Sequence, residues 1–247
     1  MSISDGAMSR RTLFGLAGAT AAAALTACGS SNNSAVIVPS EVAVTTEDSR
    51  PDITDPDLAF ARLKEGNARF VSGRMVRPDQ SPATRMRLST GQRPFAVVVS
   101  CSDSRLPPEV IFDQGLGDLF VVRVAGNIVD QAGLGSIEYA IEHLDTPLIV
   151  VLGHEKCGAV SATLNALQPP FERPHGALNS LVETITPAVE VALKQSGDLL
   201  QNAIMANVAN SRELINADPE LKGYLDRGAV KIVGGYYSLT DGTVQLT

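Results

Sequence analysis

The chain has 247 residues, a formal net charge of −7 at pH 7 and 44% hydrophobic residues. The acidic charge disfavours nucleic acid and anionic membrane surfaces as electrostatic partners, because both are negatively charged themselves, so no nucleic-acid partner is expected. Once an N-terminal segment is set aside, about 200 residues remain, which is a normal length for one domain with a sizeable core.

The N-terminus has the layout of an export signal. Arg10 and Arg11 precede an apolar run from Leu13 to Ala27, which is too short for a comfortable transmembrane helix. The paired arginines resemble a twin-arginine address, which is read by an export route that carries folded proteins. We therefore expect residues 1–27 to be a signal peptide.

The signal ends in a Leu-Thr-Ala-Cys sequence at Cys28 that resembles the bacterial lipobox. Cleavage at a lipobox leaves the cysteine as a lipid-modified first residue, and several acyl chains hold a protein stably on a membrane. We expect lipidation at Cys28, a flexible linker over 28–51, and an exported lipoprotein anchored to the membrane on its extracytoplasmic side, in the periplasm or at the cell surface. The alternative is an ordinary signal peptide cut elsewhere, which would leave Cys28 discarded or free.

Residues 52–247 are predicted to form one α/β domain. Asp55 followed by Pro56 is typical of an N-cap and a first helical position, and it predicts a helix that runs to Val71. The helix would carry an apolar stripe that can pack on its own core or on a neighbouring subunit. The stripe is Phe60, Leu63 and Phe70. Strands covered on both faces are predicted at 95–99 and 147–152, and a further strand is predicted at 229–237. Further helices are predicted to begin at 158 and to cover 177–195 and 199–215.

The first two apolar strands each lead into residues that bind metals. Cys101 follows the first strand, and His154 and Cys157 follow the second. Two thiolates and one imidazole form a three-ligand zinc set, which leaves the fourth tetrahedral position for water and substrate, as in catalytic sites. Because sites in open α/β sheets form at the carboxyl ends of strands, we expect the two segments to meet around one ion.

These cysteines and histidines also have simpler interpretations. Two buried thiols and a core histidine would explain Cys101, His154 and Cys157 without a metal. A redox protein would want a close Cys-x-x-Cys pair, which is absent. His143 is expected near the C-terminal end of a helix, and His175 is expected in a loop, where it could shuttle protons if the loop lies near the mouth of the site.

Two charged residues follow the first ligand. Zinc lowers the pKa of bound water from near 16 to about 7, so hydroxide is available at neutral pH. Asp103 lies two residues after Cys101, where its carboxylate can accept a hydrogen bond from that hydroxide or bind the metal itself and close the site. Arg105 can hold the carboxylate in a bidentate pair, ionised and away from zinc, so we expect Asp103 and Arg105 to be catalytic.

These segments resemble the β-class carbonic anhydrases over roughly residues 55–247. The resemblance implies an α/β fold with a mainly parallel central sheet flanked by helices, and an active site at the interface of a homodimer or higher homo-oligomer. It implies zinc as the cofactor and the reversible hydration of CO2 to bicarbonate and a proton by zinc-bound hydroxide. The segments that carry it are Cys101 to Arg105, Gly153 to Gly158, Gly66 to Phe70, Val121 to Asn127 and Ser136 to Ala140.

The resemblance also implies a CO2 pocket lined by Gln92, Phe120, Tyr139 and Gly158, partly from the second subunit. Phe120 and Tyr139 are also plausible as ordinary core residues, although the pocket role is favoured. Some members of the family bind bicarbonate at an allosteric site built around a tryptophan three residues before the first ligand, and in an inactive, closed form Asp103 would ligate zinc. That position is Val98 here, so we expect the open form.

Two further functions share part of this pattern. A hydrolase of carbonyl sulfide or carbon disulfide would have the same ligands and fold, and would differ in access to the pocket. A non-catalytic lipoprotein that stores or senses zinc would have no need of Asp103, Arg105 and Gln92. The presence of these three residues argues against the second alternative.

Overall fold

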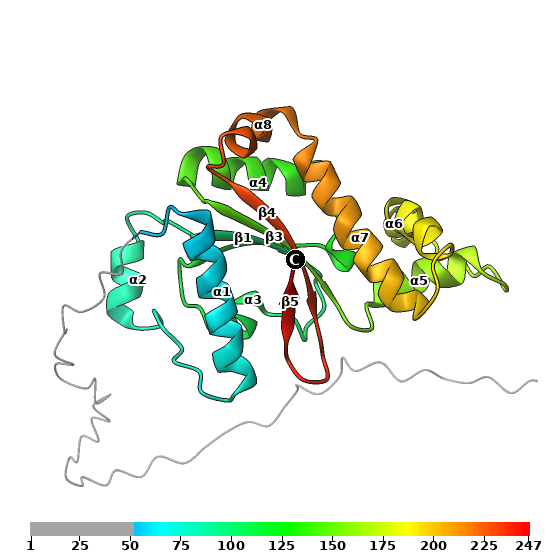
Figure 1. Ribbon diagram of the computed structural model, residues 1–247, viewed down its shortest axis with the longest axis horizontal. Helices are drawn as coiled ribbons and strands as arrows, with labels where there is room; N and C mark the ends of the chain where they lie inside the picture. The colour runs from blue at the N-terminus through cyan, green and yellow to red at the C-terminus, as the bar shows by residue number, and fades with distance from the viewer. Residues whose placement is uncertain (1–51) are drawn as a thin grey trace, which may run out of the picture. The chain divides into compact units, whose positions relative to one another are not determined.

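The computed structural model describes residues 52–247, so the predicted signal peptide, Cys28 and the linker lie outside the described residues. The described residues form one five-stranded sheet with helices on both faces (Figure 1). In chain order the elements are α1 (Pro56–Val71), α2 (Pro82–Leu88), β1 (Ala96–Ser100), α3 (Pro108–Ile111), β2 (Leu119–Arg123), the 3-10 turn η1 (Ala125–Asn127), α4 (Gln131–Leu144), β3 (Leu148–His154), α5 (Gly158–Leu167), α6 (Leu178–Ala192), α7 (Leu199–Asn216), α8 (Pro219–Asp226), β4 (Lys231–Tyr237) and β5 (Val244–Leu246).

The sheet has the strand order β2-β1-β3-β4-β5. Strands β2, β1, β3 and β4 are parallel to their neighbours, and only β5 is antiparallel, which confirms the predicted mainly parallel sheet. Every residue of β1 and β3 is buried, as their continuous apolar sequences predicted. β3 continues through His154, which pairs with Tyr237 of β4, so His154 is the last residue of the strand rather than the first residue after it.

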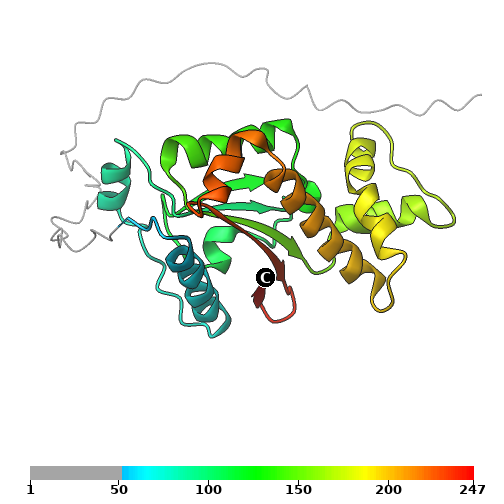
Figure 2. The same cartoon turned by 45° about the horizontal axis from the view of Figure 1, so that its top comes forward.

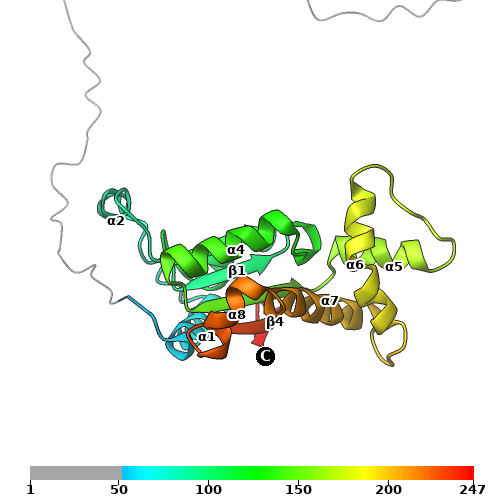
Figure 3. The same ribbon diagram turned by 90° about the horizontal axis from the view of Figure 1, so that it is seen from above.

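Alternate side chains of the strands divide the core into two layers. On one face Val97, Val99, Ile149 and Val151 pack with residues of α4, α7 and α8. On the other face their sequence neighbours pack with α1 and α3, and Figures 1 and 2 show these helices on opposite sides of the sheet. Figure 3 shows α5 and α6 beyond one end of the sheet. Each fully buried Val, Ile or Leu contributes roughly 1.5–3 kcal/mol, so the two layers supply most of the stability.

Helix α1 begins as the sequence predicted. The carboxylate of Asp55 caps it by accepting hydrogen bonds from the backbone N–H groups of the second and third helical residues, at 2.8 and 3.0 Å. Leu63 is fully buried, and Phe60 and Phe70 are half-buried against the core of the same chain. The apolar stripe of α1 therefore packs on its own core in this structure, which is one of the two partners that the sequence left open.

A buried amide ties α1 to the C-terminal hairpin. The side chain of Asn67 donates hydrogen bonds to the carbonyl oxygens of Ile111, at 3.2 Å, and Gly242, at 2.9 Å, and its own oxygen accepts one from the N–H of Val244 at 2.9 Å. All three partners are backbone groups, so the amide replaces ladder hydrogen bonds that this irregular region lacks. Asn67 therefore fixes α3 and the β4–β5 hairpin to the same helix.

A buried carboxylate holds the chain that follows α1. Asp113 pairs with Arg69 and accepts hydrogen bonds from the N–H groups of Val76, at 3.0 Å, and Arg77, at 2.8 Å. Burial by itself raises the pKa of Asp113, but the hydrogen bonds from these three residues outweigh burial and leave the pKa below its usual value.

No helix between residues 52 and 247 has the length and apolarity needed to cross a bilayer.

Candidate metal centre and active site

The carboxyl ends of two neighbouring strands bring three metal-binding side chains together. Cys101 directly follows β1, His154 ends β3, and Cys157 caps α5. Their ligand atoms all lie within 4.8 Å of one another, and among residues 52–247 they form the one cluster of three or more such groups that could hold an ion. The structure thus brings together the three residues that the sequence proposed as ligands.

The polar groups of the cluster fit a metal ion. The Nδ1 atom of His154 lies 2.9 Å from the carbonyl oxygen of Glu155, which can only accept, so Nδ1 carries the hydrogen and Nε2 keeps its lone pair. That Nε2 atom is buried and has no hydrogen-bond partner. A buried imidazole nitrogen without a partner is costly unless something else binds it, and a zinc ion coordinated by two thiolates and this nitrogen would satisfy it.

The two sulfur atoms lie within 4.8 Å of each other. The contact with Cys157 lowers the pKa of Cys101 despite burial, and the N–H of Gly126 lowers it further. The same contact and burial raise the pKa of Cys157, although the N–H groups at the start of α5 oppose the rise. One thiolate is therefore ready to bind a cation, and a bound cation favours the second thiolate because metal ligands must be deprotonated.

Beside the ligands, Asp103 and Arg105 form the predicted bidentate pair. The guanidinium Nε donates to Oδ1 at 2.9 Å and Nη2 donates to Oδ2 at 2.6 Å, while the backbone N–H of Arg105 donates to Oδ1 at 2.9 Å. These hydrogen bonds hold the pKa of the Asp103 carboxyl well below its usual range, against a smaller opposing effect of burial. The carboxylate is ionised, and both of its oxygens are held by Arg105.

Two residues that the sequence analysis did not assign a role also support the first ligand. Arg123, the last residue of β2, donates through Nε to the carbonyl oxygen of Cys101 at 3.0 Å and through Nη2 to that of Asp103 at 2.6 Å. The N–H of Gly126 donates to the Cys101 sulfur at 3.2 Å. Both belong to the 121–127 segment that the resemblance singled out. In the sequence, the sign of this support for Cys101 was an arginine followed by a glycine turn.

The proposed pocket residues are only partly brought together within one chain. Gly158 adjoins the ligand Cys157, and the rings of Phe120 and Tyr139 lie 6.3 Å apart. Phe120 pairs with Val97, four residues before Cys101, so it lies about 13 Å from the ligand along the strand direction. Tyr139 is 48% exposed, and Gln92 is exposed in the loop before β1.

The remaining histidines lie outside the metal cluster. His143 is in the last turn of α4, as predicted, where its ring lies 5.1 Å from that of Tyr139. His175 is exposed in the loop before α6, again as predicted. Neither contributes a ligand atom to the cluster, so the three-ligand set has no fourth histidine or cysteine among the described residues.

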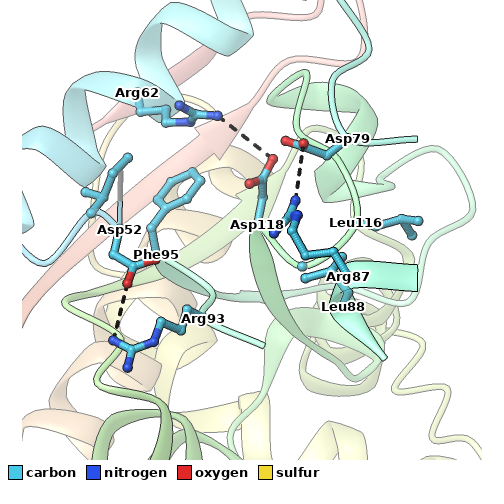
Figure 4. Close-up of a pocket in the computed structure, with 11 residues that line it drawn as sticks. Asp52, Arg62, Asp79, Arg87, Leu88, Arg93, Phe95, Leu116 and Asp118 are labelled. Carbon is cyan, nitrogen blue, oxygen red and sulfur yellow. Dashed lines mark ion pairs between the residues drawn. The ribbon is translucent and has the colours of Figure 1, made fainter. Parts of the chain in front are cut away.

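A charged pocket lies at the opposite end of the sheet from the metal cluster. Figure 4 shows three arginine–aspartate ion pairs in it, near the residues that precede β1 and β2. The charges balance within the pocket and it contains no metal-binding cysteine or histidine, so the ion pairs serve to hold α1 and the 79–93 segment on the sheet. The pairs are Arg62–Asp118, Arg87–Asp79 and Arg93–Asp52, at 4.0, 3.9 and 3.4 Å.

Two thiols, one imidazole and a clamped carboxylate at the carboxyl edge of a parallel sheet define a metalloenzyme site with an open coordination position. The family model described as carbonic anhydrase matches residues 96–244. The chain is 45% identical over 194 residues to the carbonic anhydrase of Mycolicibacterium smegmatis and 43% identical over 194 residues to carbonic anhydrase 2 of Mycobacterium tuberculosis, covering 78% of this chain and 94% and 93% of those proteins. The chain therefore belongs to the carbonic anhydrase family.

Solved structures identify the class within this family. The β-carbonic anhydrase CcaA superposes with a TM-score of 0.60 at 28% identity, over 76% of this chain and 86% of that chain. The Coccomyxa β-carbonic anhydrase superposes with a TM-score of 0.58 at 26% identity, over 65% of this chain and 74% of that one. The fold is that of the β class, as the sequence resemblance implied.

Proposed function

We propose that this protein is a zinc-dependent carbonic anhydrase that reversibly hydrates CO2 to bicarbonate and a proton. The observation that carries the proposal is the convergence of Cys101, His154 and Cys157, whose ligand atoms lie within 4.8 Å of one another beside the Asp103–Arg105 pair. The two thiolates and the imidazole would hold a zinc ion, which would supply the Lewis acidity that makes water a nucleophile near neutral pH.

The protein's own residues orient the reaction. The Asp103 carboxylate is an acceptor, and Arg105 fixes both of its oxygens, so it can align an attacking water through one hydrogen bond without itself taking the proton. The water oxygen forms the new bond to the carbon of CO2 while one C=O π bond opens and its electron pair moves to oxygen, and one proton leaves to solvent, which gives bicarbonate. Because Arg105 holds both oxygens of the carboxylate, the pair supports the proposal that Asp103 does not become a fourth ligand, which would be the open form expected from Val98.

The substrate pocket is proposed to be completed by a second copy of the chain. Phe120 on the edge strand β2 is half-buried and pairs with Val97, four residues before Cys101, and Tyr139 on α4 is half-exposed. Apolar surface of this kind suits an unpolarised gas, and a homodimer would allow one chain to offer Gln92, Phe120 and Tyr139 to the ligands and Gly158 of the other.

Metal removal tests the proposed activity directly. The protein is assayed for proton release on mixing with CO2 as purified, after dialysis against a chelator, and after one zinc per chain is restored. We expect activity to follow zinc content and to return on reloading. Zinc bound at one per chain without CO2 hydration would refute the proposal, and a parallel assay with carbonyl sulfide and carbon disulfide would then test the alternative substrates.

The protein is further proposed to be an exported lipoprotein, cleaved before Cys28 and held by its lipid on the extracytoplasmic side, in the periplasm or at the cell surface. Support comes from the order of paired arginines, apolar run and Leu-Thr-Ala-Cys sequence. An export route for folded proteins also suits a Cys2His centre, since zinc can bind before the two thiols meet an oxidising compartment.

Partition into detergent tests the lipid anchor. In cells labelled with a fatty-acid analogue, we expect the wild-type chain to carry label and to enter the detergent phase of Triton X-114. Cys28→Ala is the matched control, because it removes the acceptor and leaves the apolar run intact. Equal labelling of both chains, or wild-type protein wholly in the aqueous phase, would refute lipidation at this position.

A further inference from the structure

Helix α7 carries two polar side chains on its buried face. Asn207 and Ser211 are each 1% exposed, and they lie on the same stripe as Ile204, Val208 and Ile215. Leaving a polar group unpaired in such a place costs about 1–3 kcal/mol, so a helix that only needed to pack on the sheet would be better served by apolar residues. Packing on the sheet therefore does not explain why the buried face of α7 carries two polar side chains.

Both side chains donate to the backbone of the η1 turn. The Asn207 Nδ2 atom donates to the carbonyl oxygen of Gly126 at 2.6 Å, and the Ser211 hydroxyl donates to that of Asn127 at 3.0 Å. These are consecutive carbonyl groups of one turn, reached from consecutive turns of one helix. Neither contact is local, since the partners are 81 and 84 residues apart in the sequence.

The η1 turn needs such support because its backbone is unusual. Gly126 has φ 76° and Asn127 has φ 45°, so two successive residues are left-handed, and one of them is not a glycine. Such a conformation persists only where surrounding groups fix it. The hydrogen bonds from Asn207 and Ser211 fix the two carbonyl groups that a relaxed turn would reorient.

The orientation of this turn determines the environment of a metal ligand. Gly126 donates its N–H to the Cys101 sulfur at 3.2 Å, and the same residue accepts the Asn207 amide through its carbonyl. The N–H belongs to the peptide before Gly126 and the carbonyl to the peptide after it, so the two hydrogen bonds hold both peptide planes and limit rotation about the φ and ψ bonds of Gly126 between them. N–H donors to a coordinating sulfur stabilise its negative charge and orient it.

We infer that Asn207, assisted by Ser211, is a positioning residue for the metal ligand Cys101, acting through the Gly126 turn. Asn207 touches neither substrate nor metal. Its amide holds the peptide that follows Gly126, which limits the rotation at Gly126 that would turn the preceding N–H away from the Cys101 sulfur. The inference rests on the zinc site of the proposed function, and it predicts effects on metal binding that a residue needed for folding alone would not produce.

The test compares two buried asparagines in the full-length protein. Asn207→Leu removes the amide that holds the turn, while Asn67→Leu removes another buried amide, whose hydrogen bonds go to α3 and the C-terminal hairpin rather than to the turn or the ligands. Zinc dissociation constants are measured by chelator competition. We expect Asn207→Leu to weaken zinc binding about 10–100-fold, the usual range for outer-sphere substitutions, and Asn67→Leu to leave it within about threefold.

A spectroscopic readout separates positioning from general destabilisation. In the cobalt(II)-substituted protein, loss of the N–H donor raises the energy of the sulfur lone pairs, so the thiolate-to-cobalt charge-transfer band moves to longer wavelength in Asn207→Leu and stays in place in Asn67→Leu. Ser211→Ala is measured in parallel, and we expect a smaller shift of the band in the same direction. If Asn207→Leu fails to fold, the band position in Ser211→Ala tests the positioning role in its place.

The outcomes are distinguishable. If the wild-type protein binds no zinc, the proposed function itself fails. If the wild type binds zinc but Asn207→Leu and Ser211→Ala match Asn67→Leu in both the dissociation constant and the cobalt band, the positioning role is refuted and the two side chains are structural only.

Discussion

Substituting Gly126 by alanine should destabilise the protein through two separate effects. At φ 76° and ψ 18° a residue with a Cβ atom costs about 1–2 kcal/mol more than glycine. The added Cβ would lie 2.7 Å from Ile185 Cδ1 and 3.1 Å from Ala159 Cβ. Because the first neighbour is the end of a side chain that can rotate, overpacking adds about 1–2 kcal/mol, at the lower end of the usual range. The sum is about 2–4 kcal/mol.

Thermal unfolding of the zinc-loaded protein measures this change. For a domain of this size each kcal/mol lowers the Tm by roughly 2–4 °C, so we expect a fall of roughly 4–16 °C. Gly135→Ala is the matched control, because Gly135 lies within α4 with nothing near its Cβ position, and alanine there should raise the Tm slightly. A Gly126→Ala Tm within 2 °C of wild type would refute the reasoning, as would an equal fall in the control.

Two further predictions concern charged side chains. Arg105→Gln frees the Asp103 carboxylate, so it should lower kcat/KM for CO2 about 10–100-fold, with little change in Tm. Arg93→Gln, in another exposed arginine–aspartate pair, is the control and should leave kcat/KM unchanged. Equal activity of the two variants would contradict the role of Arg105. The lowered pKa of Asp113 means that its carboxylate stabilises the fold above the usual aspartate pKa of about 3.9 and that this stability is lost as the pH falls below it. The Tm difference between wild type and Asp113→Asn should therefore shrink between pH 7 and pH 3, and a constant difference would count against the network.

Elements with strong local signals could be predicted from the sequence. The strands β1 and β3 are continuous apolar runs that are covered on both faces, and α1 has an aspartate cap and a proline at its first position. The edge strand β2 was not predicted as a strand, although turn residues stand on both sides of it, and only one of its five residues is buried. The short helices α2 and α8 were not predicted either, although each begins with a capping side chain and a proline, as α1 does. β5 has only three residues, too few for a strand pattern in the sequence.

The metal ligands could be predicted because their chemistry and spacing are local. Cys101, His154 and Cys157 each stand at or next to the end of an apolar strand, and parallel strands end at one edge. The support for these ligands could not be found in the same way. Arg123, Gly126 and Asn207 act through backbone contacts that only the folded chain creates, although two polar residues on an otherwise apolar helix face were a visible sign.

The proposed pocket residues do not all lie beside the metal ligands within one chain. Gly158 adjoins a ligand, but Phe120 lies level with Val97 in the sheet and Tyr139 is half-exposed on α4. Their roles as substrate contacts stay predictions that depend on a second subunit. A homodimer in solution whose formation buries Tyr139 is the arrangement that these predictions require.

Stopped-flow CO2 hydration tests the central claim most directly. The wild-type protein loaded with one zinc per chain is compared with Cys157→Ser, which removes one thiolate ligand and little volume. We expect rapid hydration by the wild type and its loss in the variant, together with weaker zinc binding. Hydration that is equally fast in both proteins, or absent from a wild type with zinc bound at the three ligands, would contradict the account.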